Sequence, residues 1–273
     1  GYYQHPQNTV IFLGDFIDRG QQQRETLNVV IPMIKQGSAI SVMGNHELNA
    51  IAYHTLKQNS SGDYLRPHLD KNIHQHHAFL KAYPDDIERS EVIEWFKTLP
   101  LWIELNGLRI IHACWHQTVI ERVQHKLQGN TLTPEMLHEA LTHKTSLFTD
   151  IEILLKGVET TLPNGVIFTD NYGHERTEVR AKWWLTGAIP INEAVLDQGV
   201  VDDITTPIKE DALPGYNLNK KPCFIGHYWH KGTPQYITPN LACVDYSVAK
   251  NGKLVAYRFS GETTLNNNNF FWV

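Results

Sequence analysis

The sequence contains little cysteine and no long apolar run. Its three cysteines, Cys114, Cys223 and Cys243, are widely spaced and form no CxxC pair, so we expect no disulfide framework and favour a reducing compartment. No stretch is apolar over the length that a bilayer requires, and the N-terminal residues lack the charged and apolar regions of a signal peptide. These absences predict a cytoplasmic protein without a membrane partner.

Runs of positive charge are missing as well. The chain carries 24 Lys and Arg against 29 Asp and Glu, which gives a net charge of −5. This balance supplies no general basic surface for a nucleic acid polymer, so an anionic substrate would have to be held locally. The 273 residues, 41% of them hydrophobic, are enough for one large domain with insertions. We therefore predict a single domain over residues 1–273.

Five short apolar runs end abruptly in polar residues and predict buried strands. They are TVIFLGD (9–15), AISVMGNHE (39–47), LRIIHACWH (108–116), KPCFIGHYWH (221–230) and LACVDYS (241–247). Between the first two, apolar residues recur at helical spacing before Gly37, and Pro32 is expected to kink or shift that helix. The pattern predicts a strand, a helix and a strand in succession, which is typical of an α/β fold.

Residue types that bind metals follow four of these predicted strands. Asp15 follows the first, Asn45 and His46 the second, His112 the third and His227 the fourth. Side chains at the carboxyl ends of strands can converge in one crevice of an α/β protein. The mixed oxygen and nitrogen donors suit manganese, iron or zinc, whereas Cys114 is better explained as a small core residue. The spacing alone therefore predicts a metal centre.

The ordered motifs GDFIDRG (14–20), GNHE (44–47), a histidine after an apolar strand, and IGH (225–227) resemble those of the calcineurin-like metallophosphoesterases. The resemblance is to the branch that holds serine/threonine phosphoprotein phosphatases and bacterial diadenosine tetraphosphatases. It implies an α/β fold of four layers, with two central β-sheets flanked by helices. It also implies hydrolysis of phosphoesters by a metal-activated water, without a covalent intermediate.

The same resemblance assigns roles to individual residues. It implies two divalent metal ions (manganese, iron or zinc) bridged by Asp15. It implies that the second ion is completed by Asn45, His112 and His227. It further implies His46 as the general acid, Asp18 as the carboxylate that orients it, and Arg19 as a phosphate clamp. Arg180 is a candidate for the second phosphate arginine of related enzymes, with Arg176 as a rival and a salt-bridged cap residue as the alternative interpretation of Arg180. A carboxylate can bridge two ions, an arginine presents a planar fork to phosphate oxygens, and an aspartate helps a histidine to hold its proton.

The sequence departs from the family pattern at two places. The first family motif, GDxHG, which supplies an Asp and a His to the first metal, is absent, so we expect it roughly 30 residues upstream, a strand and a helix in length. Some members end in GHxH, but here Trp229 takes the place of the second His and His230 is out of register. The chain itself therefore shows one full metal site and half of another.

Several conspicuous residues have ordinary structural explanations. We interpret Glu47 as a charge at a helix N-terminus, the HQHH group (74–77) as a solvated helical face, and His116 as a capping or surface residue. Trp183 and Trp184 are expected to fill core, with stacking on a substrate base as the alternative, and Asp245 is interpreted as structural. Residues 131–213, rich in charge and in turn signals such as LPNG, are predicted to form a cap over the site.

The substrate remains open between alternatives. A nucleotide or dinucleoside polyphosphate fits the bacterial branch, and a phosphoprotein fits the phosphatase branch. A catalytically silent, metal-binding scaffold is the alternative from another class, because the first motif is missing. The sequence does not decide the oligomeric state.

Overall fold

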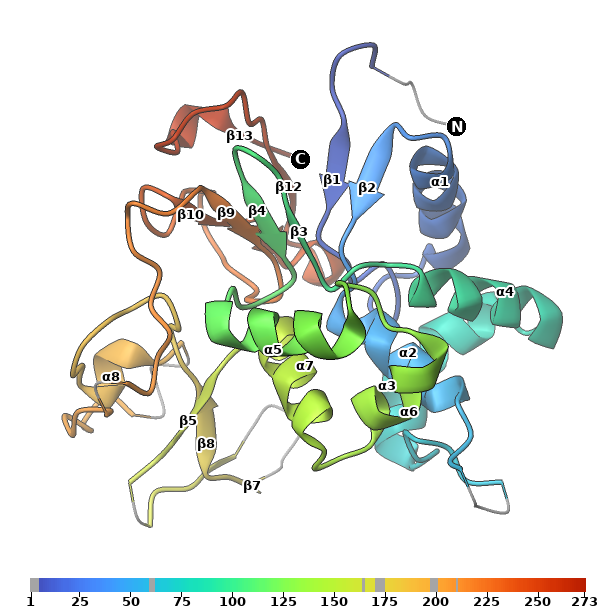
Figure 1. Cartoon of the computed structure of the whole chain (residues 1–273), viewed down its shortest axis with the longest axis horizontal. Helices are drawn as coiled ribbons and strands as arrows, with labels where there is room; N and C mark the ends of the chain where they lie inside the picture. The colour runs from blue at the N-terminus through green and yellow to red at the C-terminus, as the bar shows by residue number, and fades with distance from the viewer. Residues whose placement is uncertain (1–4, 59–61, 164, 170–174, 197–200, 210) are drawn as a thin grey trace.

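A computed structural model describes residues 5–58, 62–163, 165–169, 175–196, 201–209 and 211–273 (Figure 1). The first half of the chain forms β1 (Val10–Phe12), α1 (Gln23–Lys35), β2 (Ala39–Ser41), α2 (Asn45–His54), α3 (Asp70–Ala82), α4 (Asp86–Lys97), β3 (Trp102–Glu104), β4 (Arg109–Ile111) and α5 (Gln117–Leu127). The middle forms α6 (Pro134–Leu141), α7 (Ser146–Lys156), β5 (Glu159–Thr161), β6 (Phe168–Thr169), β7 (Glu175–Arg176), β8 (Glu178–Arg180) and α8 (Ile191–Ala194). The end forms β9 (Cys223–Ile225), β10 (Leu241–Cys243), β11 (Asp245–Tyr246), η2 (Val248–Lys250), β12 (Lys253–Tyr257), η3 (Asn267–Asn269) and β13 (Phe270–Trp272).

The five predicted strands are all present, as β1, β2, β4, β9 and β10, which confirms the α/β class. Strands β1 and β2 pair in parallel, and a second sheet has the order β10-β9-β4-β3, in which only β3 runs antiparallel to its neighbour. Strands β11, β12 and β13 form an antiparallel sheet near the C-terminus. Helix α1 continues through Pro32 to Lys35, so the proline does not end it.

The core lies on both faces of the β10-β9-β4-β3 sheet. Successive side chains of a strand point to opposite faces, and accordingly Ile111 packs with the helices whereas its neighbour Ile110 packs with Val255 and Phe270 of the C-terminal sheet. Figure 1 shows helices α2 to α7 grouped on one side of the strands β1, β2, β4 and β9. This arrangement leaves the loops that follow these strands facing the helices.

The predicted cap region, residues 131–213, contains two differently packed parts. Helices α6 and α7 bury Leu141 and Leu154 in the main core. A separate apolar cluster begins at Leu162 and includes Val179 and Ile191. The part built around this second cluster has a core of its own, whereas α6 and α7 belong to the main core. We therefore keep the prediction of a cap over the site as a proposal for that part only.

Two expectations about buried side chains hold. Trp183 and Trp184 are buried in the main core, and Trp183 donates a hydrogen bond from Nε1 to the Ala113 carbonyl at 3.1 Å. Cys114 is fully buried and makes no disulfide.

No helix of the described part of the chain combines the length and the apolar character that crossing a bilayer requires. The cytoplasmic location stays a prediction.

Candidate metal centre

Two glycines let the loops after β1 and β2 meet. Gly14 has φ +83°, and a Cβ on it would lie 2.3 Å from the Gly44 nitrogen; a Cβ on Gly44 would lie 2.4 Å from the nitrogen of Asp15. Real Cβ atoms do not approach backbone that closely, so only glycine fits at both positions. The glycines of the two motifs therefore bring Asp15 next to Asn45.

Glu47 ties the same two loops together from the first turn of α2. Its Oε2 accepts hydrogen bonds from the backbone N–H groups of Asp15 (2.8 Å) and Gly44 (2.9 Å), and its Oε1 accepts one from Phe16 (2.8 Å). The side chain is fully buried, and burial together with the charge of Asp15 raises the pKa of Glu47 to about 7. The sequence indicated only that Glu47 lies at the start of a helix. That Glu47 joins the two loops follows from their contact in the tertiary structure.

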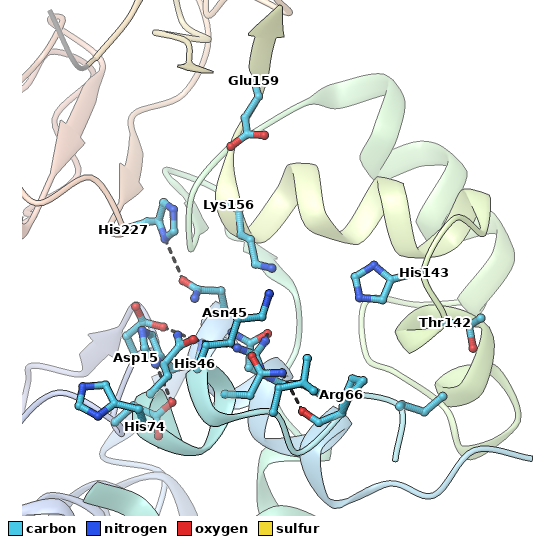
Figure 2. Close-up of a pocket in the computed structure, with 18 of the residues that line it drawn as sticks. Asp15, Asn45, His46, Arg66, His74, Thr142, His143, Lys156, Glu159 and His227 are labelled. Atoms are coloured by element: carbon cyan, nitrogen blue, oxygen red, sulfur yellow. Dashed lines mark hydrogen bonds and ion pairs between the residues drawn. The ribbon is translucent and has the colours of Figure 1, made fainter. Parts of the chain in front are cut away.

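The four predicted metal ligands converge at the ends of their strands. Figure 2 shows three of them, Asp15, Asn45 and His227. The Asn45 Oδ1 lies 2.8 Å from His227 Nδ1 and 3.2 Å from His112 Nε2, and His112 Nε2 lies 3.4 Å from Asp15 Oδ1. Asp15, His112 and His227 each offer a ligand atom within 4.8 Å of the other two. The elements that supply them are far apart in sequence, so the strand order brings the donors together.

The chemistry of this donor set fits a divalent ion. His112 donates from Nδ1 to the Leu13 carbonyl at 2.5 Å, which orients Nε2 toward the cluster. His227 Nε2 is buried without a hydrogen-bond partner among the described residues. Burial opposes ionisation of Asp15, but His112 and the neighbouring histidines outweigh it and lower its pKa; in turn Asp15 outweighs burial and raises the pKa of His112 to about 9. A bound cation would replace these protons as the partner of Asp15.

The predicted acid and its carboxylate are in direct contact beside the ligands. His46 Nδ1 lies 2.8 Å from Asp18 Oδ2, and the backbone N–H of His46 donates to Asp15 Oδ1 at 3.1 Å. Burial opposes protonation of His46, but Asp15 and Asp18 outweigh it and raise its pKa. The Arg19 Nε lies 3.4 Å from His46 Nε2. Asp18 and Arg19 of the GDFIDRG motif therefore both contact His46 of the GNHE motif.

One expectation about the HQHH group is wrong. His76 is 3% exposed rather than solvated, and its Nδ1 lies 2.7 Å from Asp18 Oδ1, so the aspartate is held between two histidines. The other ring nitrogen of His76 lies 3.3 Å from His54 Nε2. Burial and the proximity of His76 lower the pKa of His54 to about 3. The reason for the error is that α3 turns this residue toward α2, whereas His74 and His77 remain exposed.

Backbone strain is concentrated at the same place. Four non-glycine residues of the site have positive φ: Asp15 (+59°), Asp18 (+76°), His227 (+67°) and Trp229 (+28°). Such conformations are unfavourable for side-chain-bearing residues and persist where surrounding contacts enforce them. The loops are therefore shaped by their contacts rather than by local preference.

A crevice of about 1720 Å³ opens over the cluster. Both candidate phosphate arginines of the middle region line it: Arg180, half-buried on β8, and Arg176, exposed on β7. Arg19 also lines it, with its guanidinium 4.5 Å from the centre of the Trp229 ring. Its walls do not include Trp183 or Trp184 among the described residues, so the alternative of base stacking finds no support.

The remaining candidates lie outside the ligand group. His116 occupies the N-cap position of α5, but its side chain makes no capping hydrogen bond. His230 contacts the Tyr246 ring and is not part of the ligand group found among the described residues. Asp245 accepts a hydrogen bond from the Ser247 N–H at 2.9 Å, which agrees with a structural role.

Comparison with known proteins assigns the architecture. Residues 3–177 match the family model described as calcineurin-like phosphoesterase. The chain belongs to this family. The membership confirms the resemblance drawn from the motifs. It also agrees with a metal-dependent site, because the matched region contains Asp15, Asn45 and His112.

Two curated proteins are similar to parts of the chain, and a solved structure is similar to nearly all of it. A symmetrical bis(5'-nucleosyl)-tetraphosphatase of Methylobacillus flagellatus is 29% identical over 101 residues, which cover 37% of this chain and 31% of that protein. The asymmetrical enzyme PrpE of Oceanobacillus iheyensis is 27% identical over 135 residues, 49% of this chain and 51% of PrpE. A serine/threonine phosphatase structure from Saccharomyces cerevisiae has a TM-score of 0.45 at 14% identity, covering 98% of this chain and 70% of that one. The chain thus spans from a third to half of these curated relatives.

Proposed function

We propose that this chain is a metal-dependent phosphoesterase whose substrate is a nucleotide or a dinucleoside polyphosphate. The observation that carries the proposal is the convergence of Asp15, Asn45, His112 and His227 beside the paired His46 and Asp18, at the base of one crevice. The relatives named as bis(5'-nucleosyl)-tetraphosphatases favour this substrate class over a phosphoprotein.

The proposed cofactor is a pair of divalent ions, manganese, iron or zinc. Asn45, His112 and His227 would hold one ion together with Asp15, and Asp15 would also contribute to holding the other. When bound, such ions lower the pKa of a shared water and neutralise the charge that develops on phosphate. The donors present fit this role because they combine a carboxylate, an amide oxygen and two imidazoles without a thiolate.

The protein's own side chains supply the remaining chemistry. Asp18 orients His46 through Nδ1, so that Nε2 of His46, which lies beside Arg19, can deliver a proton to the oxygen of the leaving group. Arg19, whose guanidinium contacts the Trp229 ring, and Arg180 line the crevice and would bind phosphate oxygens with their planar guanidinium groups. We propose these residues as the catalytic and binding groups.

The proposal is tested by the leaving-group dependence of a His46→Gln variant in buffer with manganese. Protonation matters most when the leaving oxygen is basic, so hydrolysis of an alkyl phosphate should fall by about 10²–10⁴-fold while nitrophenyl phosphate falls much less. His74→Gln, which alters an exposed histidine of the crevice, is the matched control. Wild-type protein that neither releases phosphate from nitrophenyl phosphate nor cleaves diadenosine tetraphosphate to mononucleotides would contradict the enzymatic proposal and favour a silent scaffold.

A further inference from the structure

We propose that Arg66 forms a second anion subsite in the crevice, which binds a phosphate group adjoining the one that reacts. The inference rests on the proposed function and narrows its substrate class. It predicts a substrate that contains a phosphate chain rather than a single phosphate ester.

Arg66 is held in place by hydrogen bonds to two amide side chains, and no acidic side chain among the described residues pairs with its charge. Its Nη1 donates to Asn49 Oδ1 at 2.5 Å and its Nη2 donates to Gln75 Oε1 at 2.8 Å. Both partners are neutral amides, and within the described part of the chain no carboxylate lies within ion-pairing distance of the guanidinium. Only two of its five N–H donors are used in these bonds. The remaining donors and the full positive charge are available to an anion.

The half-buried position of Arg66 makes this arrangement costly without a ligand. Burial lowers the pKa of Arg66, and the more distant Asp18 and Glu152 offset this only in part. A buried charge is ordinarily paired with an opposite charge, because desolvation is otherwise unfavourable. Arg66, fixed between two amides at the wall of the crevice, would gain the opposite charge that it lacks when an anionic ligand binds.

The distance from the metal centre suits the next phosphates of a chain. Asn49 follows the metal ligand Asn45 by four residues, so on helix α2 it lies on the same face and about one turn, roughly 5.4 Å, further along. The Arg66 guanidinium is therefore bonded to a side chain of the next turn of α2 beyond Asn45. Figure 2 shows Arg66 between the ligand cluster and the opposite wall, where Thr142 and His143 lie. A polyphosphate chain can span such a separation, whereas a single phosphate bound to the ions cannot.

Lys156 adds positive charge above the same part of the crevice. It comes from the end of α7 and forms an ion pair with Glu152, 2.5 Å from Nζ to Oε2. In Figure 2 its side chain extends into the pocket between Asn45 and Arg66. Because Lys156 already has a carboxylate partner, Arg66 is the better test of the subsite.

Arg66→Gln is expected to separate two substrates. Loss of charged hydrogen bonds to a second phosphate should lower kcat/KM for diadenosine tetraphosphate about tenfold or more, with nitrophenyl phosphate changed less than twofold. Arg66→Lys should recover part of the loss because it keeps the charge. The matched control is Arg109→Gln, which removes a half-buried arginine paired with Glu104 outside the crevice. Equal losses on both substrates in Arg66→Gln would overturn the subsite and leave the phosphoesterase proposal standing.

A binding measurement keeps the two proposals distinguishable. Calorimetric titration of inorganic tripolyphosphate into the metal-free protein should give about tenfold weaker binding to Arg66→Gln than to wild type, with Arg109→Gln unchanged. If the wild type hydrolyses neither substrate but this difference appears, the subsite stands and the enzymatic proposal fails. Tripolyphosphate that binds both proteins equally, or neither, contradicts the subsite whatever the activity.

Discussion

The two walls of the crevice are built differently. The loops after β1, β2, β4 and β9 form one wall. Its residues Asn45, His46 and His227, together with the adjoining His112, are at most 7% exposed, and they contact one another or a neighbouring carboxylate. The rest of the lining includes Thr142, His143 and Arg176, which are exposed, and Arg180, which is half-buried. We call the first the braced wall and the second the open wall.

The difference separates two tasks. Groups that hold an ion or move a proton need fixed positions within a fraction of an ångström, and buried mutual contacts provide them. Groups that select a substrate can remain on exposed side chains that adapt to the ligand. We therefore expect substitutions on the braced wall to affect metal content and chemistry, and those on the open wall to affect substrate binding.

The largest effect is expected from Glu47→Gln on the braced wall. The amide would turn an N–H group toward one of three backbone donors, so at least one buried N–H loses its partner. We expect the free energy of unfolding to fall by about 3 kcal/mol, together with loss of bound metal. Denaturant unfolding and elemental analysis measure both quantities. Glu91→Gln, on the exposed side of α4, is the control, and a Glu47→Gln protein with unchanged metal content would show that the two loops meet without it.

A smaller effect is expected from His76→Gln, because His76 acts through Asp18. Loss of the donor to Asp18 Oδ1 leaves His46 less firmly oriented, and we expect kcat for an alkyl phosphate to fall about tenfold. The loss on nitrophenyl phosphate should be smaller, which a merely structural defect would not produce. His76→Asn should recover activity because its amide nitrogen can take the place of Nδ1, and His77→Gln alters an exposed neighbour as control. Uniform losses on both substrates would assign His76 to stability alone.

The smallest effect is expected where the open wall contributes, at Arg180. Arg180→Gln should raise KM for nitrophenyl phosphate about threefold to tenfold, with kcat less affected, because one charged hydrogen bond to phosphate is lost. Arg176→Gln is the direct comparison, since both arginines line the crevice. A larger rise in KM for Arg176→Gln would assign phosphate binding to Arg176 instead of Arg180. If KM rises in neither variant, these two arginines do not bind phosphate.

The predictable part of this site has a local signature. Asp15, Asn45, His112 and His227 each follow an apolar run directly, so the end of a strand determines where each side chain emerges. Parallel strands that end at one edge bring such residues together whatever lies between them. The strand positions, the α/β class and the convergence of the four candidate ligands could therefore be predicted from the sequence.

The buried position of His76 was only weakly indicated by the periodicity of the sequence. Asn72, His76 and Phe79 recur on one face of α3, and all three are buried. That spacing is a signal for an inward face, but polar residues dominate the helix and favour the solvated interpretation. Only the packing of α3 against α2 gives His76 a buried carboxylate as its partner.

Glu47 and Arg66 depended on the tertiary structure alone. The sequence by itself determined which residues end strands, because hydrophobic runs and glycine breaks act over a few positions. It did not determine that Glu47 would accept three bonds across two loops, nor that Arg66 would lie between the amides of Asn49 and Gln75. Those partners come from different elements, and their distances follow from how helices and sheet pack together, which no local pattern encodes.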